Sequence, residues 1–465
     1  MKSGKILTIG LVLLLGISML AYARGGSEQS SSSGSGVTTI RVWSNDAHNK
    51  TEFDDLVAKF NAGTGAQKGI KIEYTVYGAD WETAMALALE TGREPEIFKG
   101  MSNLQSYVQA GKFLPWTEIP GVEGILKAQE PYHLNQFSIF NGVPYSVVMY
   151  GWFSGLHYNK ALLQRAGYSA PPKTWAEFED MAIKISKLEP GKIYGYAMPL
   201  VWSPDFTTWM TEYMATNSIG HMFWNFTEGK FQFVDFAPYY EMLGRIRDQR
   251  AMFPGMESLS DDQQRAQFAA GNIGFIGGAG WNVGVLYEQF PFNPLDGWDY
   301  TPLPVQNANT SYAVPVAAGP AYFVSAQLKG NRDKLTKVGE VLKLFCGDET
   351  QMLMFTAGKH IPLRADVAAK SAPSQRPQWT SYGRSAAKTV TMPSSPIDQL
   401  TPEGANRVVV IGQILTGQIP VSGIRNALLD LERRYNAAFD QAVQRGQIKR
   451  ADFIDPIFET RLRAR

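Results

Sequence analysis

Cysteine is almost absent from this chain. The only one among 465 residues is Cys346, so no intramolecular disulfide can form. Cys346 lies in the apolar stretch 341–346, which is typical of a small residue buried in a core. No histidine is suggested as its partner in nucleophilic catalysis. The sequence therefore favours neither a disulfide scaffold nor a thiol enzyme.

An excess of one charge is also missing. Lys and Arg total 44 against 43 for Asp and Glu, whereas nucleic-acid binders carry a basic surface. Phosphate-loop and serine-hydrolase motifs are absent. The histidines have none of the spacings of metal ligands: His48, His133, His157, His221 and His360. We expect no nucleic-acid partner, no cofactor, no metal and no catalytic residue.

Long apolar runs do not occur beyond the N-terminus, so we expect no membrane insertion of the mature chain. At the N-terminus, Lys2 and Lys5 precede an apolar stretch at 6–21 that ends in a small-x-small sequence. This is typical of a secretory signal peptide cleaved after Ala23. The alternative, a membrane anchor, needs about 20 apolar residues. Since no cysteine lies near the cleavage site, we expect a periplasmic protein without a lipid anchor.

What the sequence has is aromatic residues, with 11 Trp, 20 Tyr and 25 Phe, and a regular alternation of strands and helices. Strands are predicted at 37–43, 70–76 and 96–98, with helices at 53–60 and 81–90 between them. A second alternating region begins near residue 156. This order predicts an α/β protein whose parallel sheets are covered by helices. In such sheets ligands bind beyond the carboxyl ends of the strands.

Six segments stand out in order along the chain: residues 40–43 (IRVW), 88–97 (ALETGREPEI), 142–160 (from GVPY to LHYNK), 166–178 (AGYSAPPKTWAEF), 268–281 (FAAGNIGFIGGAGW) and 358–366 (GKHIPLRAD). Together they resemble the family 1 extracellular solute-binding proteins, the class that includes maltose-binding protein. The usual acidic residue after the Thr-Trp pair is Ala176 here, and 313–319 lacks the family's glycine cluster.

The resemblance implies a two-lobed periplasmic binding protein fold. Each lobe is expected to hold a mixed, mainly parallel sheet flanked by helices. After a signal peptide (1–23) and a flexible linker (24–36), lobe 1 is expected at 37–150 plus 304–361, and lobe 2 at 151–303 plus 362–465. The three interlobe crossings are then expected at 147–153, 300–305 and 358–363.

The function implied is that of a non-catalytic binding component of an ABC importer. A ligand that touches both lobes stabilises their closed arrangement. The expected partners are a sugar or small oligosaccharide and the permease subunits in the membrane, and the protein is expected to be a monomer.

The expected ligand-binding residues lie beyond strand ends and near the crossings. A sugar site needs flat rings against C–H faces and polar groups around the edge. The candidates are Trp43, Asn45, Asp46, Asp80, Asn103, Trp152, Trp202, Asp205, Trp281, Tyr322 and Arg364.

Trp281 is the main candidate. The resemblance places a ligand-facing tryptophan there, and Gly277, Gly278 and Gly280 before it let backbone approach a ligand. The alternative is a core tryptophan. Asp80 is alternatively a helix N-cap. Lys99, after the third strand, is interpreted as solvated.

For Arg364 two roles are open, a bidentate bond to an acidic sugar or an interlobe salt bridge, and we favour the salt bridge.

Other classes of protein remain as alternatives. A glycoside hydrolase needs two carboxylates about 5–10 Å apart, and Asp46, Asp80 and Asp205 offer candidates. A membrane-receptor sensor is a second alternative. Within the fold, a polyol or a glycerol-phosphate diester is an alternative ligand.

Overall fold

The structure is a computed structural model that describes residues 36–78, 80–101, 103–134, 137–200, 204–308, 314–318, 322–386, 389–391, 393 and 395–459. The predicted signal peptide and nearly all of the predicted linker lie outside these residues. None of the helices in the described ranges is long and apolar enough to cross a membrane.

The first sheet has the strand order β13-β3-β1-β2. Its strands are β1 (Thr38–Ser44), β2 (Ile70–Val76), β3 (Ile97–Lys99) and β13 (Tyr322–Val324). β1 runs parallel to β2 and β3, and β13 is antiparallel to β3. The predicted parallel sheet at the start of the chain is therefore confirmed.

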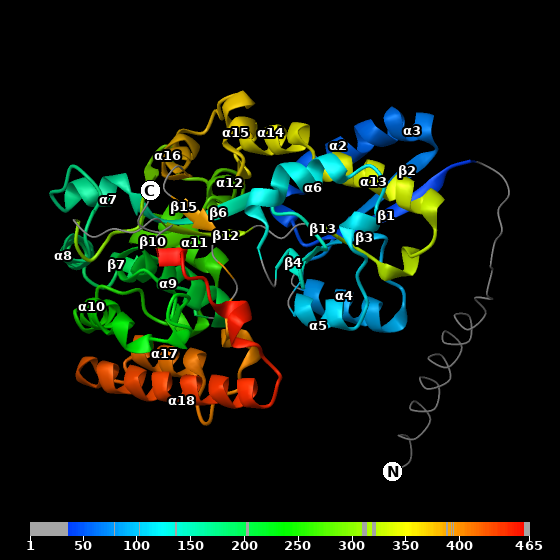
Figure 1. The fold of residues 1–465 in the computed structure, drawn as a ribbon. Helices are drawn as coiled ribbons and strands as arrows, with labels where there is room; N and C mark the ends of the chain where they lie inside the picture. Colours follow the sequence, from blue (N-terminus) through cyan, green and yellow to red (C-terminus); the bar gives the residue numbers. More distant parts are fainter. Residues whose placement is uncertain are drawn as a thin grey trace, which may run out of the picture.

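Helices of the first lobe surround this sheet (Figure 1). They are α2 (Lys50–Ala62), α3 (Thr64–Lys68), α4 (Trp81–Thr91), α5 (Leu104–Gln109), α6 (Glu123–Gln129) and α13 (Arg332–Cys346). Apolar residues at helical spacing, such as Leu335, Val338 and Leu342 of α13, are buried in the core. Cys346 is buried too, and this burial raises the pKa of its thiol.

The second sheet has seven strands, with the order β15-β12-β6-β10-β7 and with β11 and β14 also paired to β6. They are β6 (Tyr150–Asn159), β7 (Tyr194–Ala197), β10 (Ile273–Ala279), β11 (Trp298–Thr301), β12 (Val314–Ala318), β14 (Ile361–Pro362) and β15 (Thr389–Thr391). β10 is parallel to β7 and β12 to β15, whereas β6 is antiparallel to its partners.

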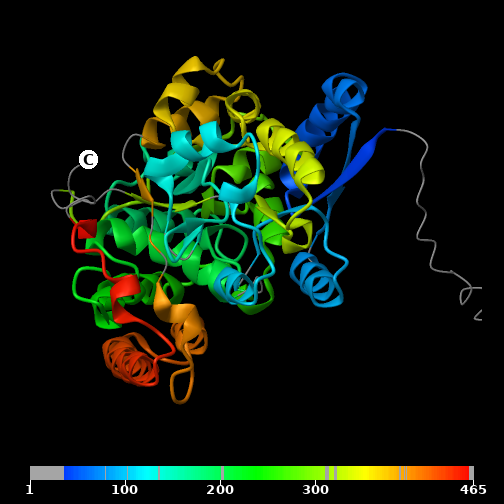
Figure 2. The same cartoon turned by 45° about the vertical axis from the view of Figure 1, so that its right-hand side comes forward.

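The helices of the second lobe are α7 (Lys160–Arg165), α8 (Trp175–Ser186), α9 (Pro204–Ile219), α10 (Ala237–Asp248), α11 (Asp261–Ala269), α12 (Trp281–Glu288), α16 (Pro377–Ala386), α17 (Arg407–Thr416) and α18 (Ile424–Gln444). Thr174 caps α8 through a reciprocal capping box with Glu177. α18 lies beneath the green helices in two views (Figures 1 and 2).

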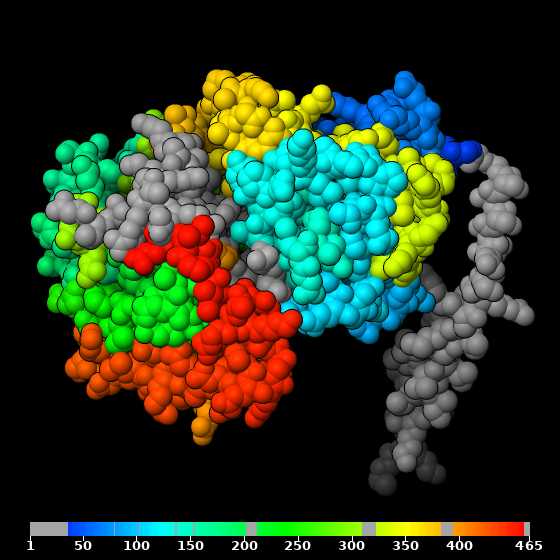
Figure 3. Space-filling model, in the orientation of Figure 1, coloured from blue at the N-terminus to red at the C-terminus, as the bar shows by residue number. Residues whose placement is uncertain are grey.

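Two of the crossings between the lobes lie side by side. Tyr150 and Gly151 at the start of β6 pair with β14, which follows α14 (Asp348–Thr356). α14 and α15 (Ala365–Lys370) cover the junction of the lobes, at the top of Figures 1 and 3.

The remaining crossing differs from the expectation at 300–305. β11 and β12 both pair with β6 of the second sheet, and the chain enters the first sheet only at Tyr322. The expected boundary at residue 304 is therefore too early. β12, the strand that keeps the chain in the second sheet after residue 305, is not predicted from the sequence.

Candidate ligand-binding site

The carboxyl ends of β1, β2 and β3 bring candidates from separate segments to one edge of the first sheet. Ser44 at the end of β1 is in register with Val76 at the end of β2, and β3 runs alongside in the same direction. Asn45 follows β1, Asp80 begins the turn into α4, and Asn103 precedes α5. All three side chains are exposed. The structure thus gathers the candidates that were expected to follow these strands.

Two aromatic rings flank this edge. The Trp43 and Tyr77 ring centroids lie 4.9 Å apart, and both residues are half-buried. Trp81, 6.1 Å from Tyr77, is buried beneath them. Half-exposed rings of this kind present flat apolar faces with little conformational entropy to lose. Tyr77 was missed from the sequence, although it directly follows the last residue of β2.

A hollow of about 390 Å³ adjoins Asn103 at the same edge. The first turns of α4 and α5 form its walls, with the side chains of Glu82, Thr83, Ala86, Met101, Asn103 and Tyr107. Asn103 has the left-handed backbone conformation, with φ of 57°, which asparagine tolerates better than most residues. Asp80 occupies the N-cap of α4, yet its side chain makes no capping hydrogen bond.

Asp46 and Lys99 form a buried ion pair beneath this edge. Lys99 is 1% exposed, so its interpretation as a solvated charge is wrong. Burial raises the pKa of Asp46, but the Lys99 ammonium, together with His360 and Asn49, more than offsets this and holds that pKa below its ordinary value. Burial lowers the pKa of Lys99, opposed by Asp46. The pair neutralises itself and fixes the loop after β1 against the end of β3.

In the second lobe, Trp281 is the first residue of α12, directly after β10, and it is partly buried. The glycines before Trp281 differ in how much room their surroundings leave for a side chain. A Cβ on Gly278 would lie 2.2 Å from the Asn282 amide nitrogen and 2.4 Å from the His157 ring. A Cβ on Gly280 would make an ordinary 3.4 Å contact with Trp379. Close packing inside the lobe therefore accounts for Gly278, rather than approach of a ligand.

Three further candidates are not fully described. Trp202 lies outside the described residues, as do the side chains of Trp152 and Asp205. The backbone of Trp152 pairs with Ala317 across β6 and β12, and Asp205 lies in α9.

Tyr322 lies in the core of the first lobe, 2% exposed and 5.1 Å from Phe345. It presents almost no surface to a ligand, because β13 places its side chain on the covered face of the sheet. Arg364 contacts Asp348 at 2.6 Å and Asp366 at 2.7 Å, so two carboxylates already neutralise its guanidinium.

The junction of the lobes holds a buried histidine. His360 stacks on Tyr150 with centroids 3.6 Å apart, and its Nε2 lies 2.8 Å from the Asn49 amide nitrogen. Burial lowers the pKa of His360 to about 3. The ring is therefore neutral near pH 7, and it fills the junction as a satisfied core residue.

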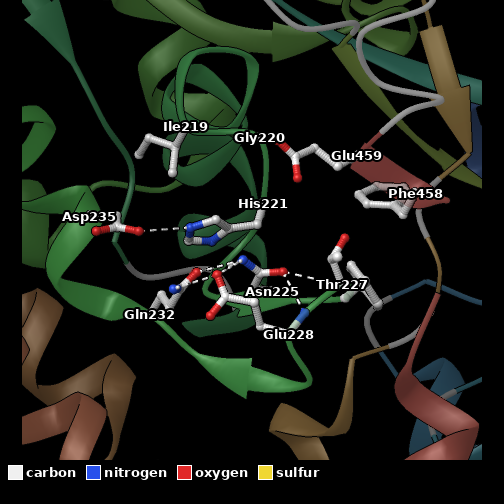
Figure 4. A pocket seen from close by; sticks show the side chains of 11 residues that line it. Ile219, Gly220, His221, Asn225, Thr227, Glu228, Gln232, Asp235, Phe458 and Glu459 are labelled. Atoms are coloured by element: carbon white, nitrogen blue, oxygen red, sulfur yellow. Dashed lines mark hydrogen bonds and ion pairs between the residues drawn. The ribbon is translucent and has the colours of Figure 1, made fainter. Parts of the chain in front are cut away.

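A polar pocket of about 210 Å³ lies elsewhere, in the second lobe (Figure 4). His221 contacts Asp235 at 3.1 Å, and Asn225 donates to Gln232 at 2.8 Å. Asn225 also accepts from the backbone N–H of Thr227 at 3.0 Å. These groups bind one another and tie together the turn between β8 (Trp224–Asn225) and β9 (Lys230–Phe231). Within the described ranges, no cluster of three metal-ligating side chains occurs.

The two sheets, the crossings and the ring-lined strand ends define a two-lobed α/β solute-binding protein. Residues 47–326 match the model of the family described as bacterial extracellular solute-binding protein, and the chain belongs to this family. It is thus an ABC transporter solute-binding protein, a binding component without enzymatic activity, and the hydrolase alternative is set aside.

Solved structures agree with this fold. A chitin oligosaccharide binding protein is 18% identical, with a TM-score of 0.66 over 86% of this chain and 99% of its own. A cyclic α-maltosyl-1,6-maltose binding protein from Arthrobacter globiformis is 18% identical, with a TM-score of 0.65 over 87% and 100%. The sugar-binding protein MalE from Xanthomonas citri is 16% identical, with a TM-score of 0.63 over 89% and 100%. No curated protein matches the sequence.

Proposed function

We propose that this protein binds a neutral sugar or small oligosaccharide between its lobes and delivers it to the permease of an ABC importer. It acts in the periplasm as a monomer, after removal of a signal peptide. The observation that carries the proposal is the pair of half-exposed rings, Trp43 and Tyr77, at the carboxyl edge of the first sheet. The names of the three similar structures described above identify them as sugar- or oligosaccharide-binding proteins, which supports the same ligand class.

Ring stacking supplies a reasonable share of the affinity. Covering one sugar face removes roughly 50 Å² of apolar surface, worth on the order of 1 kcal/mol. Micromolar binding needs about 8 kcal/mol. Two or three rings and several hydrogen bonds from groups such as Asn45, Asp80 and Asn103 reach this range. Trp281 is proposed to cover the sugar from the second lobe.

The charges at the site favour a neutral ligand over a glycerol-phosphate diester. Lys99, the buried cation at this edge, is neutralised by Asp46. A phosphate at this edge would be repelled by the Asp46 carboxylate, and the Lys99 ammonium that could attract it is already paired with Asp46. A neutral polyol meets no charge penalty at this edge, but it offers the aromatic rings no flat sugar face to cover.

Calorimetric titration of the purified protein with neutral mono- and oligosaccharides, and with a glycerol-phosphate diester, tests the proposal. Saturable binding of an unmodified carbohydrate is the expected result. Binding of the phosphodiester alone would contradict the ligand class.

A further inference from the structure

Lys359 joins the two lobes at the third crossing. It lies between α14 and β14, and its side chain is 5% exposed. Toward the first lobe, its Nζ donates to the His48 carbonyl oxygen at 2.9 Å and lies 3.4 Å from the Glu52 carboxylate. Toward the second lobe, the same Nζ lies 3.2 Å from the Glu288 carboxylate.

The elements that Lys359 contacts both start on the ligand side of their sheets. His48 belongs to η1 (Ala47–Asn49), which follows the carboxyl end of β1 and its candidates Asn45 and Asp46. Glu288 ends α12, whose first residue is Trp281. One ammonium group therefore links the loop after β1 to the helix that begins with Trp281.

A second cation completes the contact. The Arg376 guanidinium lies 2.6 Å from Glu288. Gly284 of α12 leaves the space that the two cations share, because a Cβ there would lie 3.3 Å from Arg376 Nη1 and 3.7 Å from Lys359 Nζ. Two carboxylates, Glu52 and Glu288, face two cations, so the cluster is balanced in charge.

We propose that Lys359 is a positioning residue that holds the lobes in the arrangement in which a solute bridges them, an inference that rests on the proposed function. Separation of the lobes takes the His48 carbonyl and Glu52 away from Glu288, and Lys359 cannot keep both sets of contacts. The cluster and a bridging solute therefore stabilise the same arrangement. Removing the Lys359 cluster therefore weakens solute binding, and removing the solute weakens the cluster, because the coupling between the two is reciprocal.

The test compares full-length wild type with Lys359→Met, Lys359→Arg and Lys50→Met. Lys50 lies in α2, the helix that also carries Glu52, and pairs with Asp54 on its surface, where both side chains are exposed. Lys50→Met is therefore the matched control. Spin labels on Leu87→Cys and Leu429→Cys, exposed positions on α4 and α18, report the distance between the lobes. Cys346 is 1% exposed and does not take up label.

In the absence of solute, Lys359→Met is expected to broaden the distribution of label distances and to shift it to longer values. With a carbohydrate that the wild type binds, its Kd is expected to rise about 5- to 20-fold. Lys359→Arg is expected to restore most of both properties, and Lys50→Met to match the wild type. If Lys359→Met only damaged the fold, its thermal midpoint would fall, but the label distances would not lengthen and Lys359→Arg would not restore the Kd.

A distance distribution for Lys359→Met identical to that of the wild type, or a lower Kd, would overturn the proposal. If Lys359→Met does not fold, Glu288→Gln weakens the same cluster at a half-exposed position and is judged by the same outcomes. If no carbohydrate binds the wild type, the proposed function fails. The distances measured without solute still decide the role of Lys359.

Discussion

The Asp46 carboxylate and the Lys99 ammonium pair with each other while only 9% and 1% of their side chains are exposed. Removing one partner of a buried pair leaves the other charge without compensation, which costs about 3–5 kcal/mol, whereas removing both costs much less. Lys99→Met is therefore expected to lower the free energy of unfolding by about 3 kcal/mol. The double variant Asp46→Asn/Lys99→Met is expected to recover most of this loss. Urea denaturation of the three proteins at pH 7 measures the difference, and equal stabilities for the single variant and the wild type would argue against a buried pair.

Gly278 and Gly280 precede Trp281 and are expected to respond differently to alanine. At Gly278 the new Cβ meets Asn282 and His157 at under 2.5 Å, and overpacking of this kind costs about 1–3 kcal/mol. At Gly280 the contact is ordinary and the backbone is right-handed helical, so Gly280→Ala is expected to fold as stably as the wild type. Thermal unfolding compares the two. A larger loss at Gly280 than at Gly278 would contradict the packing described for β10.

Aromatic truncation tests the ligand site. Trp43→Ala, Tyr77→Ala and Trp281→Ala are each expected to weaken carbohydrate binding about tenfold or more, which is about 1.4 kcal/mol. Each variant loses a flat ring that we propose covers a sugar face. Titration calorimetry measures the dissociation constants.

Tyr322→Phe is the control for these variants, because it changes a buried tyrosine whose hydroxyl has no hydrogen-bond partner among the described residues. Its affinity is expected to equal that of the wild type. If Tyr322→Phe lost binding while Trp43→Ala and Trp281→Ala did not, our assignment of the two tryptophans to the ligand site and of Tyr322 to the core would be wrong.

Mild acid is expected to destabilise the protein through two buried histidines. Burial lowers the pKa of both His157 and His360 to about 3, from 6.5. The unfolded chain takes up protons below pH 6.5 that the folded chain refuses until about pH 3, so the stability present above pH 6.5 is lost as the pH falls. Between pH 6.5 and 5 the loss is about 2 kcal/mol for each histidine.

Urea denaturation at pH 7 and pH 5 measures this loss, and His360→Gln is expected to reduce the dependence on pH. The same slope in His360→Gln and in the wild type would mean that His360 does not contribute.

Much of the fold follows from the sequence because local patterns determine it. The β-branched strand at the start, the amphipathic α2 and the Thr174 cap of α8 each depend on residues close together in the chain. β12 was missed because its partners, β6 and β15, come from distant segments. The second crossing was misplaced for the same reason.

For the candidate residues, the sequence predicts their position along the sheet better than their exposure. Candidates after strand ends were expected at one edge, since parallel strands end together, and Asn45, Asp80 and Asn103 lie there. Whether a given side chain faces solvent or core depends on packing that no local pattern shows. Packing of this kind buries Tyr322 and Lys99 and places Tyr77 beside Trp43, and none of the three outcomes was expected from the sequence.

Small-angle X-ray scattering of the wild type, with and without a carbohydrate identified by titration, tests the central claim most directly. If the solute is held between the lobes, its saturation is expected to reduce the radius of gyration, with the carbohydrate recovered unchanged. An identical scattering curve in the presence of a saturating carbohydrate would contradict binding that closes the two lobes.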